Sequence, residues 1–249
     1  MWMSKQFYLG IERALATLTS KIVCISDAER ESAINYHITR SDRLAFIPSG
    51  IDIEAVRQAE PIRRSDLGIK DDDYVIGAIG RLVSQKAPEI FVEAAKLIKK
   101  EIGNAVFIFV GGGAETDAIR KMAEDYQIKL LLPGWVDNPY SYLKIFDMAL
   151  SLPRWEGFGL AITEYMAAEK NIVATRVDAI PTLIEDGKEG LLVDVDSPED
   201  VKDKVLYIYN HPNEAAKMRK NALEKVMRDY DIKRVAEQHR LLFNSLVEK

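Results

Sequence analysis

The residues best suited to chemistry are two glutamates, Glu156 and Glu164, with seven residues between them. Gly157 and Gly159 free the backbone on either side of Phe158. We expect a helix to begin at Gly159, with Glu164 more than a turn inside it and its first amides open to an anion. Two carboxylates that accept hydroxyl hydrogen bonds, with an anion seat between them, suit a sugar–diphosphate–ribose ligand. The alternative is an acidic helix start with Phe158 in the core.

A second candidate group is a pair of cations close to a glycine. Arg81 directly follows Gly80, and Lys86 stands at the far end of the same loop. A guanidinium offers a planar fork and an ammonium a point charge, so the two could clamp a diphosphate. Two solvated surface cations are the competing interpretation.

A third candidate is the run Gly111-Gly112-Gly113, which would let the backbone approach a ligand closely. A tight turn between strand and helix explains the run equally well. The segment is not a dinucleotide fingerprint, since its sixth position is Thr116, and no P-loop lysine follows. A dehydrogenase is therefore disfavoured.

Short apolar runs alternate with amphipathic helices, which predicts a Rossmann-like, doubly wound parallel α/β sheet. In such a sheet, ligands bind beyond the carboxyl ends of the strands, where all three candidate groups fall. The first 50 residues hold only two strands, 21–25 and 44–47, and look like the tail of another domain. The six strands of the main sheet are predicted at 74–79, 105–110, 128–132, 148–152, 172–175 and 190–193.

Helices are predicted between and beyond these strands. Ser26 with Glu29 is typical of a capped helix start, and Ser197 is expected to cap a helix ending near Tyr209. Pro133-Gly134 is expected to close the strand at 128–132. Three helices are predicted by one end only: one begins at 26, one begins at 88, and one follows the glycine run and ends near 126. The other predicted helices are 5–19, 139–146, 159–168, 180–185, 198–209, 213–228 and 231–247.

Composition narrows the function classes. The chain has 249 residues, a net charge of −5 and no dense basic block, which disfavours nucleic acid as a partner. Its single cysteine, Cys24, excludes an internal disulfide and fits a reducing compartment. The three histidines lie far apart, so no metal-ligand spacing emerges. No apolar run is long enough to span a membrane. We expect a cytoplasmic protein.

The glutamate pair with its Glu-Gly-Phe-Gly-Leu core resembles the motif of retaining GT-B glycosyltransferases, more narrowly the group 1 enzymes that use nucleotide-sugar donors. Gly80-Arg81-Leu82 with Lys86 resembles their phosphate-binding loop. Val110–Gly113 and the segment 133–136 also match, and the resemblance covers about 20–247. The combination is specific, although each piece alone is not.

The resemblance implies a role for each charged candidate. Arg81 and Lys86 would neutralise the donor diphosphate and stabilise the leaving nucleoside diphosphate. Glu156 would bind hydroxyls of the transferred sugar, and Glu164 those of the ribose. Because the cations do this work, the resemblance implies neither a metal nor another cofactor, and the substrate would be a UDP- or GDP-sugar.

The resemblance also implies backbone and base contacts. Amides near Phe158, Gly159 and Leu160 would hold sugar hydroxyls and phosphate. Gly80, Gly111 and Gly112 would let the nucleotide lie against the sheet edge, with Val136 near the base. These residues complete the predicted donor site.

Two segments depart from the family pattern. The family usually has a glycine pair where this chain has Asp178-Ala179. It usually has Gly-Leu-Pro-Val where this chain has 170–173, Lys-Asn-Ile-Val. Both segments lie on the donor-sugar side of the expected cleft. We therefore expect them to affect which donor binds and whether the sugar is transferred.

Length is the larger departure, since a GT-B enzyme has two Rossmann-like domains. We expect 1–50 to be a remnant of the N-terminal domain, 51–228 the nucleotide-sugar-binding domain and 229–249 a C-terminal crossover helix. The chain would be the donor-binding half of an enzyme that glycosylates a lipid-linked or polysaccharide acceptor, with at most peripheral membrane contact. Activity would be low in the absence of the N-terminal half. A separate polypeptide would supply that half; alternatively, the terminal helices would bind a second copy of this chain. The alternative is a non-catalytic nucleotide-binding or assembly subunit.

Overall fold

The computed structural model describes residues 2–247, with side chains from Lys5 onward. The chain forms two compact units. One contains the residues up to Ile51 together with those from Tyr230 onward, and the other is Asp52–Asp229. The expected three-part division at 1–50, 51–228 and 229–249 stays a prediction about domains. In the structure the last helix falls in the same unit as the first 51 residues.

The Asp52–Asp229 unit is built on a six-stranded sheet in the order β5-β4-β3-β6-β7-β8, in which every neighbouring pair is parallel. The chain builds outward from β3 in one direction, then returns to β6 and builds outward in the other. This order confirms the predicted doubly wound sheet. The strands are β3 (Tyr74–Ile79), β4 (Ala105–Val110), β5 (Leu130–Gly134), β6 (Met148–Ser151), β7 (Asn171–Thr175) and β8 (Leu191–Val193).

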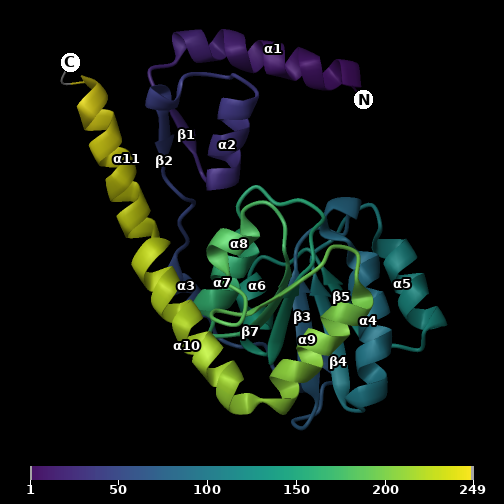
Figure 1. Cartoon of the computed structure of the whole chain (residues 1–249). Helices are drawn as coiled ribbons and strands as arrows, with labels where there is room; N and C mark the ends of the chain where they lie inside the picture. The colour runs from purple at the N-terminus through teal and green to yellow at the C-terminus, as the bar shows by residue number, and fades with distance from the viewer. Residues whose placement is uncertain (1, 248–249) are drawn as a thin grey trace. The chain divides into compact units, whose positions relative to one another are not determined.

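Helices cover both faces of this sheet. The helices α4 and α9 pack closely against each other, α5 packs beside α4, and α7 packs against β6 and β7 with α3 beside it. Figure 1 shows α4 and α5 on one side of the sheet and α7 on the other. The helices of the unit are α3 (Ile53–Gln58), α4 (Pro88–Glu101), α5 (Thr116–Asp125), α6 (Pro139–Lys144), α7 (Leu160–Ala167), α8 (Ile180–Leu183), α9 (Pro198–Asn210) and α10 (Pro212–Asp229).

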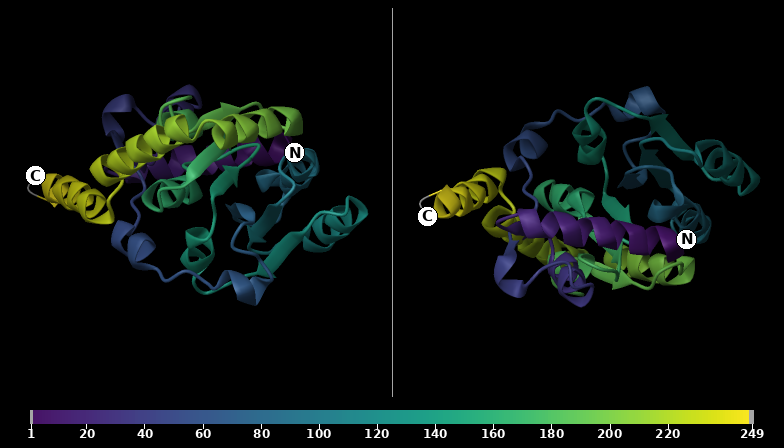
Figure 2. Two further views of the ribbon diagram at one scale, coloured as in Figure 1. Left: turned by 90° about the horizontal axis from the view of Figure 1, so that it is seen from below. Right: turned by 90° about the horizontal axis from the view of Figure 1, so that it is seen from above.

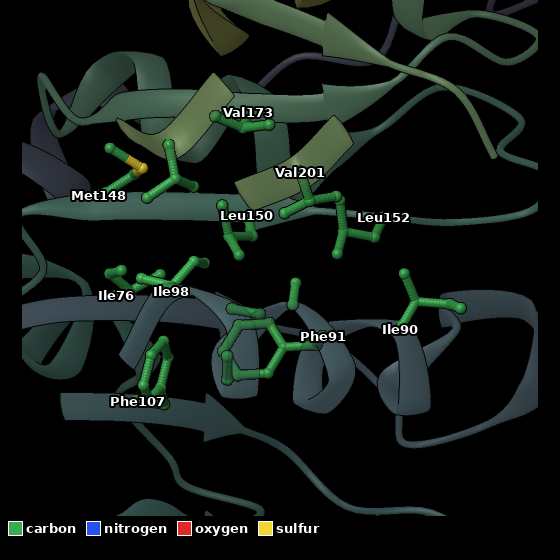
Figure 3. Packing of buried hydrophobic residues seen from close by; sticks show 14 of the residues in the cluster. Ile76, Ile90, Phe91, Ile98, Phe107, Met148, Leu150, Leu152, Val173 and Val201 are labelled. Atoms are coloured by element: carbon green, nitrogen blue, oxygen red, sulfur yellow. The ribbon is translucent and has the colours of Figure 1, made fainter. Parts of the chain in front are cut away.

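The main core lies between the sheet and α4, α5 and α9. Alternate strand residues point into it, such as Ile76 on β3 and Leu150 on β6, and they meet Phe91 of α4 and Val201 of α9 (Figure 3). All six residues of β4 are buried, as expected for a strand covered on both faces. This packing fixes the strand ends from which the candidate residues extend.

Of three local expectations, one was wrong, one was met in part and one was confirmed. Pro133-Gly134 does not close a strand at 128–132, because β5 runs through both residues. Since β5 is an edge strand, a proline without an N–H is tolerated there. Ser197 occupies the N-cap position of α9 as expected, but its side chain makes no cap bond, and Pro198 opens the first turn. The Ser26 cap is confirmed, because its hydroxyl accepts from the Glu29 amide at 3.1 Å.

The first unit contains α1 (Trp2–Leu18), β1 (Ile22–Cys24), α2 (Asp27–Asn35), β2 (Leu44–Phe46) and α11 (Ile232–Val247). Figure 2 shows α1 as one uninterrupted helix. The strands β1 and β2 pair in parallel as a two-stranded sheet. Several large apolar side chains of α1 are exposed, among them Phe7, Leu15 and Leu18.

Candidate functional site

The predicted site residues lie along one edge of the sheet. Because all six strands are parallel, their carboxyl ends share that edge. The order of the strands brings the loops after β3 and β6 side by side, at the point where the winding direction reverses. The segments at this edge carry Val136 after β5, Gly111 and Gly112 after β4, Gly80, Arg81 and Lys86 after β3, and Glu156, Phe158, Gly159 and Leu160 after β6.

Lys86 and Glu156 form an ion pair across these two loops. Their side chains are only 22% and 14% exposed, which strengthens the attraction relative to a surface pair. The Glu156 amide donates a 2.8 Å hydrogen bond to the Asp178 carboxylate. The sequence predicted Lys86 and Glu156 as separate ligand groups, whereas in the structure each satisfies the other.

Arg81 joins the same loops through a side chain that the sequence did not single out. Its guanidinium donates to the Gln85 Oε1 atom at 3.0 Å, and the Gln85 amide donates to the Trp155 carbonyl at 3.0 Å. Arg81 itself is exposed. An exposed guanidinium, anchored through Gln85 to the loop after β6, can turn toward an incoming phosphate.

Arg154 was also missed by the sequence, because it belongs to no motif that carries chemistry. Its guanidinium contacts the Ser84 carbonyl at 2.8 Å, Glu89 at 2.5 Å and Asp196 at 2.8 Å. The hydrogen bonds that Arg154 donates to the Asp196 and Glu89 carboxylates raise its pKa above the usual range. Arg154 thereby ties the loops after β3, β6 and β8 to the first turn of α4.

The start of α7 has the geometry that an anion seat needs. Gly159 is its N-terminal capping residue with φ +105°, a left-handed conformation that L side chains rarely adopt. No side chain caps the helix, so its first amides have no intrahelical acceptor. Phe158 is buried in the core, as the competing interpretation held, while Leu160 is exposed. Any ligand contact of Phe158 is therefore confined to its backbone.

Glu164 lies one and a half turns into α7 and accepts a 3.0 Å hydrogen bond from the Tyr140 hydroxyl. Burial raises the pKa of Glu164, and the Tyr140 hydrogen bond partly opposes that rise. Burial, followed by the negative charge of Glu164, raises the pKa of Tyr140 to about 12. Tyr140 was not predicted, because it lies on α6 in a segment without any motif.

The glycine run divides into two structural roles. A Cβ on Gly111, whose φ is +131°, would lie 1.9 Å from the Gly80 carbonyl oxygen, and one on Gly113 would lie 2.2 Å from that of Leu82. These two glycines therefore allow the loops after β3 and β4 to touch. A Cβ on Gly112 would meet nothing within 4 Å. Of the three, Gly112 is the residue whose Cα faces open space.

No group of three or more His, Cys, Asp or Glu side chains among residues 2–247 is placed to hold a metal ion. No helix in that part of the chain is both long and apolar enough to cross a bilayer.

Comparison with known proteins gives consistent matches. The family model described as "Glycosyl transferases group 1" matches residues 60–225. The chain is 31% identical over 176 residues to a poly(ribitol-phosphate) alpha-N-acetylglucosaminyltransferase of Staphylococcus aureus, covering 70% of this chain and 36% of that protein. It is 28% identical over 267 residues to the UDP-Gal:alpha-D-GlcNAc-diphosphoundecaprenol alpha-1,3-galactosyltransferase of Escherichia coli, covering 98% and 65%.

A crystal structure of Anabaena Alr3699/HepE in complex with UDP and glucose has the same fold. Its TM-score is 0.85 at 19% identity, covering 97% of this chain and 68% of that one. Against the two curated relatives, the chain spans between about a third and two thirds of their length.

Proposed function

The chain belongs to the group 1 glycosyltransferases, and from this membership we propose that its Asp52–Asp229 unit binds a nucleoside-diphosphate sugar for transfer to a second substrate. The two curated relatives are named for sugar transfer, and the Anabaena structure contains UDP and glucose. These names support a UDP-sugar as the donor, with a GDP-sugar as the alternative. The acceptor we propose is lipid-linked or a polysaccharide, and the transfer retains the anomeric configuration.

The observation that carries this proposal is the convergence of charged groups at the ends of β3 and β6. Lys86 pairs with Glu156, Arg81 is linked through Gln85 to the loop after β6, and α7 offers uncapped amides beside them. Cations placed where a departing diphosphate gains negative charge lower the barrier to transfer. Glu164, farther along α7, is the residue that we propose binds the ribose hydroxyls.

The remaining proposed contacts follow the order of the strands. Gly80, Gly111 and Gly112 let the nucleotide lie against the sheet edge, and Val136 after β5 lies near the base. Backbone amides of Phe158, Gly159 and Leu160 hold sugar hydroxyls and phosphate. The donor then extends across the ends of four neighbouring strands, β5, β4, β3 and β6.

Calorimetry with UDP, GDP and their sugars tests the proposal. We expect wild-type protein to bind one nucleotide series, with no loss of affinity in EDTA, because Arg81 and Lys86 replace a metal. Glu164→Ala should weaken binding at least about tenfold, the effect of losing a buried charged hydrogen-bond partner. Glu124→Ala, an exposed change on α5, is the matched control. Failure of the wild type to bind either series would contradict the proposal.

We propose further that efficient sugar transfer by this chain requires additional polypeptide that completes the first unit. A two-stranded parallel sheet with exposed apolar side chains on α1 is too small to be stable alone. The separate N-terminal half of a GT-B enzyme would supply the missing strands, and transfer by this chain alone would be low. Co-purification of a second polypeptide would support this, whereas a dimer by light scattering would favour a second copy.

The non-catalytic alternative, an assembly subunit, has no finding in its favour, and the relatives are named as transferring enzymes. Sugar transfer from a bound donor to any acceptor would exclude it. We propose neither a nucleic-acid partner nor an integral membrane segment, and we expect the protein to act in the cytoplasm or at the inner face of the membrane.

A further inference from the structure

Asp178 holds an unusual position in the loop between β7 and α8. Its φ is +42°, in the left-handed region that residues other than glycine seldom adopt. In that conformation its carboxylate accepts the 2.8 Å hydrogen bond from the Glu156 amide. The loop after β7 is thereby attached to the loop after β6, which carries the proposed sugar site.

The two carboxylates of this region are in different states. The Glu156 carboxylate is mostly buried and is engaged by Lys86. The Asp178 carboxylate belongs to an exposed residue and holds the Glu156 amide with one oxygen. Since an ionised carboxylate accepts about four hydrogen bonds, Asp178 can accept more. Of these two groups, Asp178 is the more exposed, so its carboxylate is the more accessible to a neutral, hydroxyl-bearing ligand.

We infer that Asp178 accepts hydrogen bonds from hydroxyl groups of the transferred sugar and so helps to select the donor. This inference rests on the proposed function, because it places the sugar at the loop after β6. A site that pairs with a sugar hydroxyl discriminates against a sugar that lacks it, because the bound ligand then displaces water from the carboxylate without replacing the lost hydrogen bond.

Removing the negative charge of Asp178 distinguishes sugar binding from a role in which Asp178 only supports the Glu156 loop. Nothing in UDP needs a carboxylate at the sugar position, and a negative charge near the diphosphate seat repels it. Loss of the charge should leave UDP binding unchanged or tighter while weakening the UDP-sugar. If Asp178 only held the Glu156 amide in place, a variant that keeps an acceptor oxygen for this amide would bind UDP and the UDP-sugar as the wild type does.

The test is calorimetry of the full chain with UDP, UDP-glucose, UDP-galactose and UDP-N-acetylglucosamine, and with GDP and its sugars. Asp178→Asn keeps an oxygen for the Glu156 amide and tolerates the positive φ, but it replaces the second acceptor with a donor. Asp178→Gly removes the side chain without backbone strain. Asp125→Asn, exposed at the far end of α5, is the control.

For both Asp178 variants we expect the ratio of the UDP-sugar to the UDP dissociation constant to rise at least about tenfold. The control should leave the ratio unchanged. An unchanged ratio, or equal weakening of both ligands, would overturn the role of Asp178 and leave the proposed donor site standing. A wild-type protein that binds no nucleotide at all would overturn the proposed function, and this inference with it.

Discussion

Glu164 shows how a binding group can lower the stability of the fold. Burial raises its pKa, so the folded protein is less tolerant of the charged form than the unfolded chain is. A carboxyl with a raised folded pKa contributes stability that is complete below its unfolded pKa and is lost as the pH rises through the folded value. At neutral pH the charged Glu164 therefore destabilises the unliganded protein.

We predict that Glu164→Gln stabilises the fold at pH 7 while weakening nucleotide binding. The Gln side chain can still accept from Tyr140 but carries no charge to desolvate. The expected rise in melting temperature is roughly 2–4 °C, the size of a modest stability change in a chain of this length. Thermal unfolding at pH 7 and pH 4 measures it, and the advantage should disappear at the lower pH. An equal advantage at both values would count against a buried charge.

Lys170 gives the free energy of unfolding a second pH dependence, with the opposite sign to that of Glu164. Burial lowers its pKa to about 8, and its ammonium donates to the Lys144 and Phe146 carbonyls at 2.9 Å each. Between pH 8 and 10 the unfolded chain binds more protons at this position than the folded protein does. The free energy of unfolding should therefore rise across that window.

Denaturant unfolding at pH 7.5, 8.5 and 9.5 checks this prediction. Lys170→Met should remove most of the rise, although it also removes two hydrogen bonds and lowers stability at every pH. Above pH 10 the trend should reverse, because Tyr74 and Tyr140 have folded pKa values of about 12 and ionise first in the unfolded chain. A flat profile in the wild type would show that Lys170 is not desolvated.

At the scale of elements, Gly111 and Gly112 are adjacent yet should respond in opposite ways to the same change. Gly111→Ala places a methyl group 1.9 Å from the Gly80 carbonyl at φ +131°, so we predict a loss of about 3 kcal/mol or more, or no folded protein. Gly112→Ala meets open space, so stability should change by less than about 1 kcal/mol.

Gly112→Ala should nevertheless weaken nucleotide binding, because this glycine is the one open to a ligand. Denaturant unfolding of both variants, with calorimetry of Gly112→Ala, separates the two effects. If Gly112→Ala binds nucleotide as wild type does, the nucleotide does not lie against this part of the sheet edge.

How far the sequence predicted these elements depended on where burial left a clear pattern. The strands β3 and β4 were predicted to the residue, because continuous apolar runs end at glycines. The edge strand β5 was misplaced by two residues at each end, since an edge accepts proline and partial exposure. The positions of Arg81, Lys86 and Glu156 followed from strand ends alone.

Side-chain pairing could not be predicted in the same way. That Lys86 reaches Glu156, that Tyr140 reaches Glu164 and that Asp178 holds the Glu156 amide depend on which loops become neighbours. This adjacency is fixed by the strand order, which separates partners by up to 70 residues in the chain. Motifs locate chemical groups along the sequence but do not say which of them satisfy each other.

At the scale of the whole molecule, all candidate donor residues belong to the Asp52–Asp229 unit. We predict that this segment, produced alone, folds and binds nucleotide within about threefold of the full chain. The unit has its own sheet and core, so it should unfold cooperatively. Circular dichroism and calorimetry measure both properties. A folded segment without affinity would show that the first unit contributes to the donor site.

The resemblance to group 1 glycosyltransferases and the α/β fold are both confirmed at this scale. The composition of the first unit was anticipated only through the resemblance, which implied a crossover helix at 229–249. The structure groups α11 with the residues up to Ile51, although 180 residues separate them along the chain. No local pattern in the sequence indicates such a long-range grouping.

The backbone passes between the two units twice, and both crossings occur at one place. The Ile51 amide donates to the Tyr230 carbonyl at 2.9 Å, and the Ile232 amide donates to the Ile51 carbonyl at 3.0 Å. Because the two junctions of the Asp52–Asp229 segment lie side by side, exchanging this segment leaves the ends of the flanking chain in place. A crossover at each junction between two relatives would replace the donor-binding unit and keep the first unit unchanged.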